Sequence, residues 1–200
     1  MREVIEGVFS WPWFSEPHGY NFNGHLILDA GGNLAIDPVE PSAAVIDEIA
    51  GLGVARILIT NRNHSRAANA VRARTGARTA IHPDDAAHAR GQGAELDAEL
   101  RLGERIGPLV VVGVPGKSPG EVALHWPARR VLVVGDVVIG NPAGRCGLLR
   151  EAVMDDPAGL KASVRKLLEL DFDTLLVGDG EAILEGAKQR LEELVESFPE

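Results

Sequence analysis

Cysteine is nearly absent from this chain, and it also lacks long apolar runs. The single cysteine, Cys146, excludes a disulfide within the chain, which fits a reducing compartment. A catalytic thiol needs a neighbouring base, and only Arg145 stands beside it, so we expect an inert thiol. No run approaches the roughly 20 apolar residues of a membrane-spanning helix, and the first residues lack the apolar core of a signal peptide. These absences predict a cytoplasmic protein with no membrane partner.

Basic residues are also in deficit, with 20 lysines and arginines against 29 acidic residues and a net charge of −9. This balance opposes nucleic acid as a partner, because phosphates would be repelled on average. An apolar content of 45% and a charged content of 24% are ordinary for a globular protein. The length of 200 residues predicts a single domain over residues 1–200 with a substantial core. The expected partner is instead a small molecule, and a homodimer is possible.

Apolar periodicity predicts strands and helices in alternation. Gly31-Gly32 predicts a tight hairpin, Pro41-Ser42 opens a helix, and Asp155-Asp156-Pro157 caps another. On its strand, His125 is expected to be exposed. Strands are predicted at 4–9, 25–28, 33–37, 55–60, 79–81, 99–106, 110–114, 122–126, 131–134 and 174–177, and further helices from near His64, from Pro83 and over 181–196.

Four polar motifs each stand next to an apolar run. Thr60-Asn61-Arg62-Asn63-His64-Ser65-Arg66 follows one strand, and Pro115-Gly116-Lys117-Ser118-Pro119-Gly120 follows another. Gly135-Asp136 and Gly178-Asp179-Gly180 end two later strands. In order and spacing, over roughly residues 5–195, this resembles the metallo-β-lactamase-fold superfamily of the glyoxalase II and lactonase type. That superfamily carries Thr-His-X-His-X-Asp-His, Pro-Gly-His-Thr-Pro-Gly, Gly-Asp and Gly-His-Gly. The resemblance implies an α/β fold, the αββα four-layer sandwich of metallo-β-lactamase type.

The family's metal ligands are mostly replaced in this chain. The first motif's ligand positions fall on Asn61, Asn63, Ser65 and Arg66, the second motif's histidine on Lys117, the bridging aspartate on Asp136, and the last histidine on Asp179. Only Asp136 keeps the family's residue. Amide and hydroxyl oxygens are poor zinc ligands, and an arginine does not deprotonate in a protein. The resemblance therefore predicts a degenerate site without zinc or another cofactor. Oxygen ligands from these positions would suit magnesium, calcium or manganese, but two cationic side chains in the same cavity oppose that. A displaced site that uses His64 is a further alternative, because His64 lies inside the first motif, although a lone histidine there more often forms hydrogen bonds.

The replacements suggest an electrostatic substitute for the metals. Arg66 and Lys117 would offset the carboxylates of Asp136 and Asp179, because a buried charge is costly unless paired. This cluster is either purely structural or part of an anion-binding pocket formed by Arg66, Lys117 and His64. A helix beginning near His64 would favour an anion at its N-terminus. Further expected ligand contacts are Asn61, Asn63, Ser65, Asp179 and His18, the last from a loop that overhangs the pocket in the resembling fold.

Two functions follow from this pattern. The first is a pseudoenzyme, a non-catalytic protein that binds a small, possibly anionic molecule or a partner. The second is a hydrolase of ester, thioester or lactone bonds that uses a non-standard metal site or no metal. In the second case Asp136 is the expected base, and Arg66 or Lys117 stabilises the oxyanion. The residues at the ligand positions favour the first.

Overall fold

The computed structural model describes residues 1–199, and the chain divides into two compact units with the boundary between Arg101 and Leu102. Each unit has its own sheet and its own apolar core. The prediction of one domain over residues 1–200 stays a prediction. Within residues 1–199, no helix combines the length and the apolar character needed to cross a membrane.

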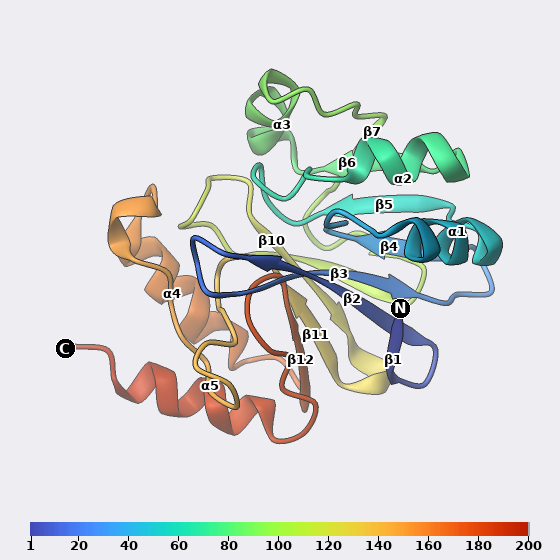
Figure 1. Cartoon of the computed structure of the whole chain (residues 1–200). Coiled ribbons are helices and arrows are strands. Elements are labelled where there is room, and N and C mark those ends of the chain that lie inside the picture. The colour runs from blue at the N-terminus through green and yellow to red at the C-terminus, as the bar shows by residue number, and fades with distance from the viewer. Residues whose placement is uncertain (200) are drawn as a thin grey trace. The chain divides into compact units, whose positions relative to one another are not determined.

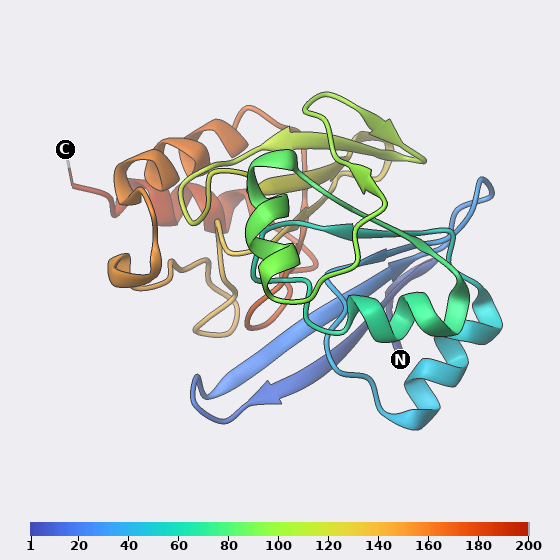
Figure 2. The same ribbon diagram turned by 90° about the horizontal axis from the view of Figure 1, so that it is seen from above.

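The first unit is a seven-stranded sheet in the order β1-β2-β3-β4-β5-β6-β7 (Figure 1). Its first four strands pair antiparallel, and β4 to β7 pair parallel. The helices α1 and α2 lie side by side (Figure 2). The elements are β1 Arg2–Ile5, β2 Val8–Ser15, β3 Tyr20–Ile27, β4 Leu34–Ile36, α1 Ala43–Leu52, β5 Arg56–Ile59, α2 Ala68–Thr75, β6 Arg78–Ile81, α3 Pro83–Gly91 and β7 Ala98–Glu99.

The long β2–β3 ribbon is held by one buried aromatic side chain. Trp11 is 2% exposed, and its indole N–H donates to the carbonyl of Val39 at 3.0 Å. Gly24 lies directly opposite Trp11, and a Cβ there would stand 2.4 Å from the indole ring. Only glycine therefore leaves room for this ring. The packing fixes the ribbon against the segment that follows β4.

The second unit is a five-stranded sheet in the order β12-β11-β10-β9-β8. All neighbours pair antiparallel except β11 and β12, which are parallel. The helices α4 and α5 contribute Leu160, Val164, Leu167 and Leu191 to its core. The elements are β8 Arg105–Ile106, β9 Leu109–Gly113, β10 Val122–Trp126, η1 Pro127–Arg129, β11 Val131–Val134, η2 Glu151–Val153, α4 Pro157–Leu167, β12 Thr174–Val177 and α5 Ala187–Glu196.

Cys146 packs against the apolar core of the second unit. The pKa of its thiol is raised to about 12, mainly by burial and to a smaller extent by Glu193, and Arg190 partly offsets the increase. A thiol with this pKa is protonated at neutral pH and is a poor nucleophile. The expectation of an inert thiol agrees with this environment.

Two predicted helices begin later than the sequence pattern indicated. α2 begins at Ala68 rather than near His64, because the Asn61 side chain accepts the backbone N–H of Asn63 at 2.9 Å and holds the segment in turns. α5 begins at Ala187 rather than at 181, because Ile183 exchanges two backbone hydrogen bonds with Leu175. Backbone groups that pair with a strand are not available to a helix.

Predictions about strands and about the exposure of one strand residue were also wrong in detail. The stretch 99–106 is not one strand: β7 pairs with β6 in the first unit and β8 pairs with β9 in the second. His125 is buried rather than exposed, at 7%. Its Nε2 lies 2.8 Å from the carbonyl oxygen of Asp171, and this hydrogen bond offsets the burial of the ring.

Candidate functional site

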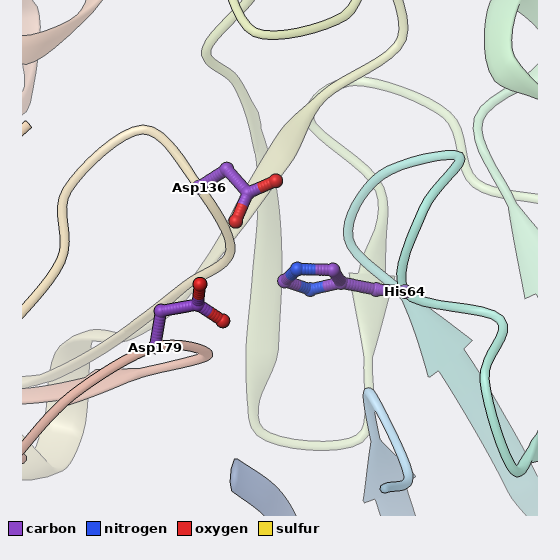
Figure 3. Close-up of side chains that lie close together, drawn as sticks. All are labelled: His64, Asp136 and Asp179. Carbon is purple, nitrogen blue, oxygen red and sulfur yellow. The ribbon is translucent and has the colours of Figure 1, made fainter. Parts of the chain in front are cut away.

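Two buried carboxylates stand at one edge of the second sheet. Asp136 follows β11 and Asp179 follows β12. These strands are parallel, with Val134 level with Val177, so both loops leave the sheet at the same edge. An oxygen of one carboxylate lies within 4.8 Å of an oxygen of the other, and each residue is 4% exposed. Figure 3 labels both side chains and His64 of the first unit.

The positive charge beside Asp136 comes from Lys117. Its Nζ lies 3.7 Å from Oδ2 of Asp136, and the lysine is 6% exposed. The turn that carries Lys117 is fixed on α4: the Ser163 hydroxyl donates to the carbonyl of Pro115 at 2.7 Å, and a Cβ on Gly116 would stand 2.3 Å from Leu160. The predicted pairing of Lys117 with Asp136 is therefore present in the structure.

A third carboxylate in this unit holds the loop of Asp136. Glu121 is 1% exposed and accepts the backbone N–H groups of Asp136 at 2.6 Å and Val137 at 2.9 Å. Two such bonds fix the direction in which the Asp136 side chain leaves the sheet. Sequence reasoning missed Glu121. The available signal was a carboxylate placed directly after Pro119-Gly120, at the start of a strand that otherwise reads as apolar.

In the first unit, His64 is bound to a carboxylate that sequence reasoning also missed. Nδ1 of His64 lies 2.8 Å from Oδ2 of Asp37, and the carboxylate also accepts the backbone N–H of Thr60 at 2.8 Å and the Thr60 hydroxyl at 2.5 Å. His64 is fully buried and Asp37 is 1% exposed. A carboxylate only accepts hydrogen bonds, so Nδ1 of His64 is the donor in this bond. Asp37 has a positive φ of 46°, which its short polar side chain tolerates.

A cavity of about 460 Å³ lies in the first unit. The guanidinium carbon of Arg66 stands 4.3 Å from the centre of the Phe22 ring. Trp13 and Phe22 face each other across β2 and β3, with ring centres 5.8 Å apart. The cavity is therefore largely apolar with one cationic side chain in its wall. It is lined by Trp13, Phe22, Val39, Glu40, Asn63, Arg66 and Ala67.

The other candidates of the first unit take separate places. Asn61 is fully buried, and its side chain stabilises the turn before α2 by accepting the backbone N–H of Asn63. In the same segment, the carbonyl of Ser65 accepts the backbone N–H of Ala68. His18 is exposed, and its Nδ1 lies 2.7 Å from the Ser15 hydroxyl. Its ring packs 5.2 Å from that of Phe22 without lining the cavity. The structure thus brings Asn63 and Arg66 together at one cavity, and Lys117, Asp136 and Asp179 together at one sheet edge.

Sequence comparison assigns a family to nearly the whole chain. The family model described as the metallo-beta-lactamase superfamily matches residues 5–198. A hydroxyacylglutathione hydrolase from Fuscovulum blasticum is 33% identical over 124 residues. That alignment covers 58% of this chain and 47% of the relative, so it spans about half of the relative's length.

Solved structures of this superfamily share the fold. A metallo-beta-lactamase from Pontibacter korlensis matches with a TM-score of 0.79 and 15% identity over 98% of both chains. A metallo-beta-lactamase family protein from Thermus thermophilus matches with a TM-score of 0.71 and 20% identity, over 96% of this chain and 79% of that one. Such identities show the fold alone. They confirm the predicted α/β fold of metallo-β-lactamase type.

Proposed function

This chain belongs to the metallo-beta-lactamase superfamily, and we propose that it is a non-hydrolytic member that binds a small anionic molecule without zinc. The observation that carries the proposal is the buried ion pair of Lys117 and Asp136. An ammonium group beside the aspartate supplies the positive charge that a metal would otherwise bring. Such a pair is costly to break, because either partner alone would be a buried charge.

The donor groups at the family's ligand positions do not fit a dinuclear zinc site. Zinc takes imidazole nitrogen, thiolate or carboxylate, and five of the seven positions hold Asn61, Asn63, Ser65, Arg66 and Lys117. Asn61 accepts a hydrogen bond from the backbone of Asn63 and thereby stabilises a turn. Arg66 stacks on Phe22, and a guanidinium does not ligate. The chemistry of these side chains supports binding of an anion rather than of a pair of cations.

The test is an activity and metal-binding experiment on the whole chain. We expect the protein not to hydrolyse acylglutathione thioesters, aryl esters or lactones when zinc, manganese or iron is added. We also expect no binding of zinc in a calorimetric titration. The matched control restores the family's ligands through Asn61→His, Asn63→His and Lys117→His together, and this variant is expected to bind zinc. Metal-stimulated turnover by the unmodified chain, lost in Asp136→Ala, would contradict the proposal.

A hydrolase remains the second candidate, and the bond between Asp37 and His64 favours it. A histidine oriented by a buried carboxylate is the usual form of a general base and of a metal ligand. Within the second unit, Asp136 and Asp179 together supply two carboxylates, which a divalent ion such as zinc, manganese or iron accepts. The name of the Fuscovulum blasticum relative also describes a hydrolase. This candidate predicts that His64→Ala and Asp136→Ala abolish the same activity. The first candidate predicts no activity to abolish.

A further inference from the structure

We infer that the cavity beside β2 and β3 binds the flat ring of an uncharged aromatic compound, and that Trp13 supplies the surface on which this ring stacks. This site is additional to the proposed anion-binding function and does not depend on it. All of the residues that line the cavity belong to the first unit.

The cavity lies on the helix-covered face of the β2–β3 ribbon. Trp11 packs into the core that α1 and α2 share, and Trp13 points to the same face because side chains two residues apart on a strand do so. Phe22 stands directly opposite Trp13 on β3 and also packs against that core. The other walls come from the segments that precede the two helices, which carry Val39, Glu40, Asn63, Arg66 and Ala67.

Aromatic rings follow one another along this face of the ribbon. The ring of Phe22 lies 5.8 Å from that of Trp13, at an interplanar angle of 30°, and 6.0 Å from that of Tyr20. Trp13 remains 42% exposed. Rings prefer offset or tilted contact with one another, and this contact adds to the gain from burying their apolar area. A flat ring in the cavity would therefore extend the row and cover indole surface that otherwise faces water.

The charges in the wall of the cavity balance each other. Arg66 and Glu40 are the two charged residues of the lining, and their charges are opposite in sign. Arg66 is already engaged within the protein, because its guanidinium carbon stands 4.3 Å from the centre of the Phe22 ring. Glu40 is exposed, so water and salt screen its charge. A charged ligand would lose hydration without meeting a net opposite charge, and the wall therefore favours an uncharged one.

The size of the cavity suits a compound of one or two fused rings. Its volume of about 460 Å³ falls within the range of roughly 300–1,000 Å³ that is typical of small-molecule sites. Trp13, Phe22, Val39 and Ala67 make most of its wall apolar, which is also typical of such sites. Naphthalene derivatives are therefore suitable probes.

The experiment compares four probes of similar size by calorimetry on the full chain. 2-Naphthalenemethanol, 2-naphthoate and (2-naphthylmethyl)ammonium share one ring system and differ in charge, whereas decahydro-2-naphthalenemethanol is uncharged and has no aromatic ring. We expect the aromatic alcohol to bind at least as tightly as either charged probe. It should also bind about fivefold tighter than the saturated alcohol, because only a flat ring stacks on the indole.

Substitutions at Trp13 test whether its ring is responsible for this preference. Trp13→Leu should weaken the aromatic alcohol about 10-fold and remove its advantage over the saturated alcohol, whereas Trp13→Phe should keep that advantage. The matched control is Phe14→Leu, because Phe14 is 57% exposed but points to the opposite face of β2 and lies outside the lining. This control should leave all four affinities unchanged, and circular dichroism checks that each variant is folded.

Tighter binding of either charged probe than of the aromatic alcohol would overturn the inference. A preference for the aromatic ring that survives Trp13→Leu, or that Phe14→Leu removes, would overturn it too, as would a folded protein that binds no aromatic alcohol. None of these outcomes bears on the proposed function, which metal-dependent turnover tests separately.

Discussion

Replacing Lys117 by methionine removes the positive charge from the buried carboxylates while keeping most of the side-chain volume. At an effective dielectric constant of 20, a separation of 3.7 Å corresponds to an attraction of about 4.5 kcal/mol between Lys117 and Asp136. Two carboxylates within 4.8 Å repel each other by about 3.5 kcal/mol or more on the same scale. The pair is longer than a direct charge-assisted hydrogen bond. Removing one partner of a buried ion pair usually lowers the free energy of unfolding by roughly 3–5 kcal/mol. Because this pair is long, we expect Lys117→Met to cost about 3 kcal/mol, at the lower end of that range.

A double-mutant cycle isolates the pair from other effects of the substitution. Lys117→Met, Asp136→Asn and the double variant are compared by urea unfolding, followed by circular dichroism at neutral pH. Because the double variant leaves neither charge uncompensated, it should be more stable than additivity predicts, by about 2 kcal/mol.

The exposed pair of Arg130 and Asp171 serves as the matched control for this cycle. Arg130→Gln should cost less than about 0.5 kcal/mol in the free energy of unfolding, because both side chains are solvated. If the loss of stability in the double variant equals the sum of the losses in Lys117→Met and Asp136→Asn to within about 0.5 kcal/mol, the claim that these two charges compensate each other is refuted.

Three further predictions concern packing and reactivity. Glu121→Ala should cost about 3 kcal/mol in urea unfolding by leaving the N–H groups of Asp136 and Val137 without their acceptor, and Glu121→Gln should cost less; equal losses would contradict the hydrogen-bonding role. Gly24→Ala should cost at least about 1 kcal/mol and change the near-ultraviolet dichroism, because the new methyl group would overlap an indole ring; an unchanged spectrum and stability would count against this packing. Cys146, with its pKa raised to about 12, should react with a disulfide reagent at pH 8 much more slowly in the native protein than after unfolding; rapid labelling of the native protein would contradict the raised pKa.

The sequence predicted three strands of the second unit closely because their apolar runs are uninterrupted and the turns beside them contain glycine and proline. Val122–Trp126, Val131–Val134 and Thr174–Val177 are strands within the predicted bounds. Helix caps were predicted as well, since Ser42 and Asp156 each accept a backbone N–H in the first turn of a helix. These features depend on neighbours along the chain.

The errors share a different origin, because they depend on partners far along the chain. Ile183 reads as a helical residue until its pairing with Leu175 is known. His125 was predicted to face solvent, because the sequence does not show that its ring nitrogen forms a hydrogen bond with the backbone carbonyl of Asp171. Local periodicity carries no information about such contacts, and tertiary pairing overrides it.

One contact, the pairing of Lys117 with Asp136, was predicted from the motifs, whereas carboxylates that only the geometry marks were missed. Lys117 and Asp136 were expected to meet, and they do. Asp37 and Glu121 were not singled out, because each acts through backbone groups or through a histidine that lies far away in the sequence. Carboxylates that orient other groups have no fixed spacing from the residues they hold.

The central claim is that the charge of Lys117 stands in for metal, and the metal content of the purified protein tests it most directly. After equilibration with mixed divalent metals and dialysis, elemental mass spectrometry should find far less than one metal ion per chain, unchanged in Asp136→Ala. Near-stoichiometric zinc, manganese or iron, lost in both Asp136→Ala and His64→Ala, would contradict the account and establish a metal site in its place.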